Sequence, residues 1–124
     1  MYLFARLSLF IIFFWFGLLK VVGVSPAESF VLELFQVTLS SWMSFETFLP
    51  LFGLFEMLIG CTFLFKKTSK LALGLILFHM ALVFSTSFLL PSTFWQAPLV
   101  PTLIGQYVIK NLSLIALAWL ISKE

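Results

Sequence analysis

Four long apolar segments separated by short polar stretches dominate this chain of 124 residues. None of them alternates polar and apolar residues as a half-buried strand does, and each approaches the roughly 20 residues that a helix needs to cross a bilayer. We therefore expect a single all-α membrane domain, residues 1–124, in which four transmembrane helices form a bundle. The expected spans are residues 3–24, 47–65, 71–90 and 102–121.

The connection between the first and second spans has its own helical pattern. Ser25 followed by Pro26 and Glu28 predicts an N-cap, a proline at the first helical position and a capping-box glutamate. Residues 26–40 are then expected to form an amphipathic helix at the membrane surface. Its apolar face, with Phe30 and Val37, would point into the lipid or onto the bundle.

Composition supports a membrane protein and excludes several function classes. Hydrophobic residues make up 62% of the chain and charged residues 10%, so a soluble fold of this size would expose too much apolar surface. A net charge of +2 without a basic run argues against nucleic-acid binding. The lone Cys61 and the absence of Cys/His clusters predict no metal site, and hydrolase and kinase motifs are missing.

Positive residues set the expected orientation. Lys66, Lys67 and Lys70 lie in the tight turn between the second and third spans, which the positive-inside rule places in the cytoplasm. Both termini, with Arg6 and Lys123, then lie on that same side. Arg6 is interpreted as a topology determinant of the same kind.

Glu56 is the most informative single residue. It lies in residues 48–65, a run with no other charge, where an unpaired carboxylate costs about 2.5–3.5 kcal/mol on insertion scales. Gly53 and Gly60 share its helical face and would let a neighbouring helix approach closely. The pattern predicts that Glu56 points into the bundle, toward a partner or a site.

Depth along the spans suggests which residues could meet Glu56. Counting about 1.5 Å per residue from the cytoplasmic ends places Glu56, His79 and Lys110 at about 15, 14 and 18 Å, near the midplane. Lys20 lies nearer the outer edge and is interpreted as a residue that snorkels to the interface. Glu56 is therefore expected to pair with Lys110 or His79. The full candidate intramembrane polar site is Lys20, Glu56, His79, Gln106, Tyr107, Lys110 and Asn111.

Two interpretations of that polar site remain open. It could be an interhelical tie that fixes packing, or a functional site in which Glu56 and His79 exchange protons. The chain has no evident cofactor motif, and a quinone is the ligand that its aromatic-rich interior would suit. Whether the protein is an enzyme is left undecided by the residues.

Three stretches together resemble the DoxX-like family of small bacterial four-helix membrane proteins, which is related to the reactive-chlorine-resistance membrane proteins. They are residues 6–20, with Arg6, Gly17 and Lys20; residues 52–60, with Gly53, Glu56 and Gly60; and residues 101–111, with Gly105, Gln106, Tyr107 and Lys110. The chain departs from the family at Ile104, where an acidic residue is common, so any ion pair of that acid is missing or supplied by another glutamate.

The resemblance implies a multi-pass protein of the bacterial inner membrane. Its expected role is an accessory or assembly subunit of a redox or oxidative-stress complex, with the lipid bilayer and other membrane subunits, or further copies of itself, as partners. A membrane oxidoreductase or quinone-binding protein is the alternative. A small transporter or proton pathway ranks last, because the spans lack broken, inverted repeats. Fold-level likeness alone fixes no single chemistry.

Overall fold

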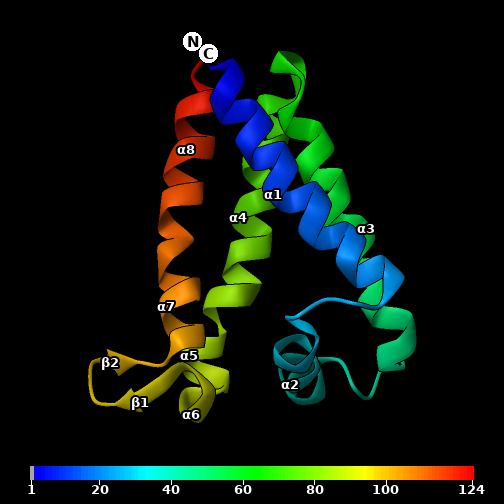
Figure 1. Cartoon of the computed structure of the whole chain (residues 1–124), viewed down its shortest axis with the longest axis vertical. Coiled ribbons are helices and arrows are strands. Elements are labelled where there is room, and N and C mark those ends of the chain that lie inside the picture. The colour runs from blue at the N-terminus through cyan, green and yellow to red at the C-terminus, as the bar shows by residue number, and fades with distance from the viewer. Residues whose placement is uncertain (1) are drawn as a thin grey trace.

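The computed structural model of the protein describes residues 2–124 and is predominantly helical (Figure 1). A two-stranded antiparallel hairpin interrupts the helices near the third connection. In chain order the elements are α1 (Leu3–Val22), α2 (Glu28–Thr38), α3 (Phe45–Phe63), a 3-10 turn η1 (Lys66–Thr68), α4 (Ser69–Phe84), α5 (Thr86–Leu89), α6 (Pro91–Phe94), β1 (Trp95–Ala97), β2 (Val100–Pro101), α7 (Leu103–Lys110) and α8 (Leu112–Ser122).

Four helical segments are long and apolar enough to cross a membrane, which confirms the predicted helical character of the four apolar runs. They are Leu3–Val22, Phe45–Phe63, Lys66–Leu89 and Leu103–Ser122. The third is made of η1, α4 and α5, and the fourth of α7 and α8 joined at Asn111. The third begins at Lys66 rather than at residue 71, because the lysine turn is itself helical.

Both termini and the lysine-rich turn lie at one end of the molecule, and α2 and the β1–β2 hairpin lie at the other (Figure 1). Helices α1 and α3 form an antiparallel pair with the most extensive contact in the structure. Helix α4 joins that pair to α7 and α8, which lie at the far edge (Figure 1). The lysine turn and the two termini thus share an end, as the predicted orientation requires. The assignment of that end to the cytoplasm stays a prediction.

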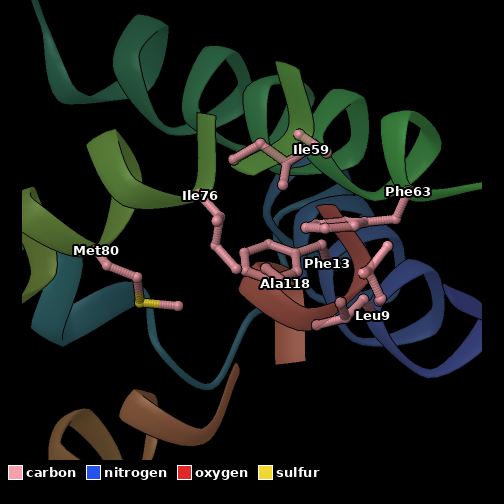
Figure 2. Packing of buried hydrophobic residues seen from close by; sticks show 9 residues of the cluster. Leu9, Phe13, Ile59, Phe63, Ile76, Met80 and Ala118 are labelled. Atoms are coloured by element: carbon pink, nitrogen blue, oxygen red, sulfur yellow. The ribbon is translucent and has the colours of Figure 1, made fainter. Parts of the chain in front are cut away.

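Glycines allow the close packing of α1 on α3. A Cβ atom added to Gly17 would collide with the carbonyl oxygen of Gly53, and one added to Gly60 would lie 2.9 Å from the backbone nitrogen of Phe14. The two backbones are therefore in direct contact, as in small-residue interfaces of membrane helices. Apolar side chains from all four spans fill the adjoining core, among them Leu9, Phe13, Ile59, Phe63, Ile76, Met80 and Ala118 (Figure 2).

Helix α2 exists as predicted, but its start differs from the sequence prediction. It begins at Glu28 with Ala27 as the N-cap and has no side-chain cap, so the predicted capping box is wrong. The hydroxyl oxygen of Ser25 instead accepts a hydrogen bond from the backbone nitrogen of Ala27 at 3.1 Å. The Ser25 hydroxyl thus forms a local turn in place of a helix cap, which is a common alternative for serine.

The residues of α2 that pack onto the bundle are not the predicted apolar set of Phe30, Leu34 and Val37, for which only the lipid alternative stays open. Val31 and Phe35 are the buried residues, whereas Val37 is 52% exposed. The ring of Phe35 packs on that of Phe48 at 5.1 Å between centroids, which ties α2 to the start of α3. The lipid contact of its outer face stays a prediction.

Pro50 lies inside α3, beyond its first turn. Ser44 caps the helix by accepting a hydrogen bond from the backbone nitrogen of Thr47 at 3.3 Å, so α3 begins at Phe45 and Pro50 is its sixth residue. Proline has no N–H to offer the carbonyl group one turn earlier, that of Glu46. The predicted start of this span at residue 47 is therefore two residues late.

Leu99, at the tip of the hairpin, allows the backbone conformation of the turn to be tested by substitution. It has a φ of 59° and is 91% exposed, so its side chain contributes little burial while its backbone is in the left-handed region. That conformation costs a non-glycine residue about 1–2 kcal/mol. Glycine removes this cost, but its greater entropy in the unfolded chain offsets part of the gain. Leu99→Gly is expected to stabilise the protein by about 0.5–1 kcal/mol in detergent unfolding experiments. Leu99→Val, which is β-branched, should destabilise it, and the opposite order would contradict the hairpin geometry.

Candidate functional site

Glu56 faces the interior of the helical assembly, as the sequence predicted. It lies on the central part of α3 and is 5% exposed. Gly53 and Gly60, one turn away on either side, are buried on the same face and let α1 approach. The carboxylate is thus enclosed by protein, where an unpaired charge would be very unfavourable.

Two side chains from other helices bind the two carboxylate oxygens. The amine of Lys20, on α1, donates to Glu56 Oε2 at 2.8 Å, and His79 Nε2, on α4, lies 2.9 Å from Glu56 Oε1. All three side chains are less than 10% exposed. We refer to Lys20, Glu56 and His79 as the buried triad, and it connects three of the four candidate spans.

The position of Lys20 corrects the interpretation that it snorkels to the interface. Its residue is 5% exposed, and its amine lies 3.5 Å from the carbonyl oxygen of Phe16, one turn nearer the start of α1. Side chains on a helix tilt toward its N-terminus, which for α1 means toward the middle of the span. A flexible lysine side chain can therefore reach a carboxylate that lies deeper in the span than its own Cα. The ion pair with Glu56 stabilises Lys20 in this inward conformation.

His79 is packed among aromatic rings. Phe52 stacks on it at 5.3 Å between centroids, and Phe13 meets it edge-on at 5.6 Å. Its second ring nitrogen, Nδ1, is buried and has no hydrogen-bond partner. We assign the neutral tautomer with the proton on Nε2, because a protonated ring would bury an unpaired N–H among the phenylalanines. The triad then holds one positive and one negative charge.

The other four candidate residues lie outside the triad. Gln106, Tyr107 and Lys110 are exposed, and Asn111 is partly buried. The amine of Lys110 lies 5.1 Å from the ring centroid of Tyr107, on its own helix. Glu56 pairs with Lys20 in place of Lys110 because the fourth span turns a different face toward α4. The buried residues of the fourth span are Gly105, Val108, Ala118 and Ile121.

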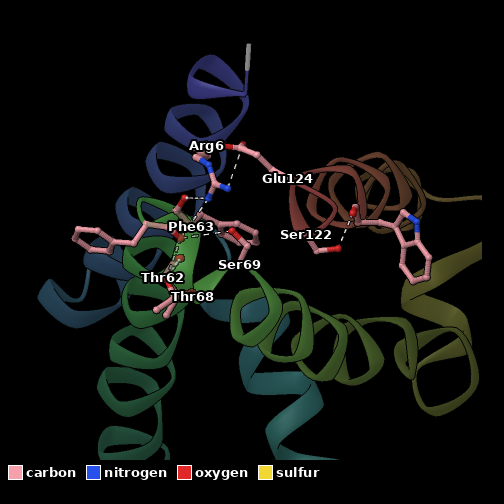
Figure 3. A network of polar contacts seen from close by, with 9 residues as sticks. Arg6, Thr62, Phe63, Thr68, Ser69, Ser122 and Glu124 are labelled. Carbon is pink, nitrogen blue, oxygen red and sulfur yellow. Dashed lines mark hydrogen bonds and ion pairs between the residues drawn. The ribbon is translucent and has the colours of Figure 1, made fainter.

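Arg6 is a second buried cation. Its helical spacing from Phe13, Gly17 and Lys20 places it on the buried face of α1, which is a signal in the sequence for its packing role. It is 5% exposed, donates to the carbonyl oxygen of Phe63 at 2.9 Å, and pairs with the carboxylate of Glu124 at 3.2 Å (Figure 3). One guanidinium therefore joins the first helix, the end of α3 and the C-terminus. This contact adds a structural role to the predicted topological one, which the structure does not address.

Arg6→Met is expected to lower the free energy of unfolding by about 1.5–3 kcal/mol, because hydrogen bonds to charged groups contribute about that much and the carbonyl of Phe63 loses its donor. Unfolding in mild detergent, monitored by circular dichroism, measures the change. Lys66→Met, at an exposed lysine of the same end, is the matched control and should change stability by less than about 0.5 kcal/mol. Equal effects of the two variants would contradict a stabilising role for the contacts of Arg6 with Phe63 and Glu124.

Two surface hollows lie away from the triad. One is lined by the hairpin residues Trp95 to Leu99 and the other by α1 residues between Phe10 and Leu18. Neither is lined by a member of the triad. Within residues 2–124, no cluster of His, Cys, Asp and Glu side chains is arranged to hold a metal ion. What the triad can do directly is hold three helices together and bind protons.

No family model, curated protein or solved structure matches this chain.

Proposed function

We propose that this protein is a DoxX-like, four-helix protein of the bacterial cytoplasmic membrane with both termini in the cytoplasm. Its proposed role is that of an accessory or assembly subunit in a redox or stress-response membrane complex. The triad serves in this proposal as the structural centre of the subunit. Its outer surfaces supply the contacts to lipid and to other subunits.

The distribution of polar and apolar side chains supports insertion into a membrane. Charged and polar groups of the triad are inside, while each span exposes many large apolar side chains. Such a surface is unfavourable in water and favourable in lipid. Representative exposed residues are Phe4 at 83%, Leu51 at 52%, Phe78 at 60% and Leu112 at 57%.

The observation that carries the accessory role is that both carboxylate oxygens of Glu56 are already paired. Both oxygens of Glu56 already have partners at 2.8 and 2.9 Å, and the two surface hollows described above lie away from it. A site that binds substrate needs free polar groups facing a cavity. The arrangement therefore favours a packing tie, with interaction surfaces on the outside, over an internal reaction centre.

Purification from native membranes in mild detergent tests this role. The full-length protein should emerge in a stable assembly with at least one other membrane protein, identified by mass spectrometry. The apolar exchange of the triad, Lys20→Met with Glu56→Leu and His79→Phe, should retain that assembly if the triad is only a tie. Isolation as a lone monomer from native membranes would remove the basis of the proposal.

A quinone-binding oxidoreductase is the second candidate, and one observation favours it. His79 Nδ1 is a buried acceptor without a donor, in a ring of phenylalanines that would suit a quinone. Solvent extraction of the purified protein, followed by chromatography, would detect a bound quinone. This alternative expects Glu56→Gln and His79→Phe to reduce the quinone content, whereas an unchanged quinone content in both variants argues against it.

A further inference from the structure

The outward face of the fourth span carries polar side chains where lipid would be expected. Gln106, Lys110 and Ser113 are spaced four and three residues apart, so they form one stripe, and all three are exposed. We call this stripe the Lys110 face. Helices α7 and α8 lie at the edge of the molecule, with α4 on their inner side (Figure 1), so the far side of the span is uncovered.

Lys110 is too deep in the span to reach water easily. It lies seven residues after Leu103 and twelve before Ser122, so its Cα is about 10 Å from the nearer end and about 18 Å from the other. Its amine turns toward the nearer end of the span and lies over the ring of Tyr107. The charge is therefore about one helical turn, 5.4 Å, closer to that end than the Cα atom is. The charge remains within the apolar layer, where a lysine is strongly disfavoured without a partner.

Apart from Glu56, no acidic residue of this chain lies at the depth of Lys110, so a second copy in the same orientation would present no free carboxylate there. Within residues 2–124 Lys110 forms no salt bridge, and Glu56 is already paired inside the triad. The other four acidic residues lie near the ends of the spans. Glu28 and Glu33 are on α2, Glu46 is in the first turn of α3, and Glu124 is the last residue.

We propose that the Lys110 face binds a transmembrane helix of a different protein that presents an Asp or Glu side chain at the depth of Lys110. Charge complementarity selects this occupant, because a second copy in the same orientation has no free carboxylate at the depth of Lys110. Gln106 and Ser113, one turn to either side, can add hydrogen bonds along the same contact. The inference rests on the proposed role as a subunit and names the surface and the chemistry of its partner.

Site-specific photo-crosslinking in the native host tests the proposal on the full-length protein. Benzoylphenylalanine replaces Tyr107, which is 54% exposed beside Lys110, and in a matched control it replaces Trp15, which is 56% exposed on α1. The expected adduct at position 107 joins a different protein through a membrane segment that contains Asp or Glu. Lys110→Met should lower its yield about tenfold, equivalent to about 1.4 kcal/mol, and Lys110→Arg should retain it.

Exchange of charges identifies the contact itself. Converting the partner's acidic residue to its amide should lower the yield as Lys110→Met does, and Lys110→Glu combined with a lysine in the partner should restore it. Three results overturn the proposal: an adduct of two copies, at twice 14.1 kDa; adducts with lipid only; or a partner adduct that Lys110→Met leaves unchanged. A partner captured only from position 15 would overturn it while leaving the accessory role intact.

Discussion

Glu56→Ala is expected to lower the free energy of unfolding by about 3–5 kcal/mol, the largest loss that we expect from any single substitution. The change removes the one anion of the triad. It leaves the buried amine of Lys20 with only the carbonyl oxygen of Phe16, at 3.5 Å, and the ring N–H of His79 without an acceptor. An uncompensated buried charge costs more than the ion pair itself contributes. Unfolding in mild detergent or in bicelles, followed by circular dichroism, measures the loss.

Glu46→Ala is the matched control for that substitution. Glu46 is an exposed carboxylate in the first turn of the same helix, so its removal should cost less than about 1 kcal/mol. The combined change of Lys20→Met with Glu56→Leu should recover much of the stability, because apolar groups of similar size often replace a buried ion pair at little cost. Similar losses for Glu56→Ala and Glu46→Ala would show that Glu56 is solvated.

Gly17→Val is expected to destabilise the protein by about 3 kcal/mol, since it forces apart the tightest helix pair. The added Cβ would meet the carbonyl oxygen of Gly53, and the side chain of Met57 at 2.9 Å. Separation of α1 from α3 would also draw Lys20 away from Glu56, so the packing and electrostatic losses occur together. Thermal unfolding of the purified variant measures the effect.

Gly74→Ala provides the comparison, because a Cβ atom at Gly74 meets nothing within 4 Å. Alanine is the better helix former, so this variant should be neutral or up to about 1 kcal/mol more stable. Equal destabilisation at positions 17 and 74 would mean that the backbones of α1 and α3 are not in contact.

Much of the architecture follows from features that are strong in the sequence. Four long apolar runs leave few alternatives to four helices, because each run is too long and too uniformly apolar for a strand. The inward direction of Glu56 is also predictable, because the cost of an anion in lipid outweighs any packing preference. The glycines at positions 53 and 60 then identify the face along which another helix approaches.

The partner of Glu56 could be predicted only in part, for a geometric reason. Counting residues from the span ends gives the depth of a Cα atom, but a lysine amine can lie about one helical turn away along the axis. Lys20 and Lys110 both come within reach on that basis. Which of them turns inward depends on how each helix is rotated, and rotation is set by packing that no single span encodes, such as the contact of Gly17 with Gly53.

A pair of double-mutant cycles tests the buried triad most directly. The first combines Lys20→Met with Glu56→Gln, and the second combines Lys110→Met with Glu56→Gln, with unfolding free energies measured in the same detergent. The triad predicts a coupling of about 2–3 kcal/mol for Lys20 and Glu56, and coupling near zero for Lys110 and Glu56. Strong coupling of Glu56 to Lys110 with none to Lys20 would contradict the structure and the function built on it.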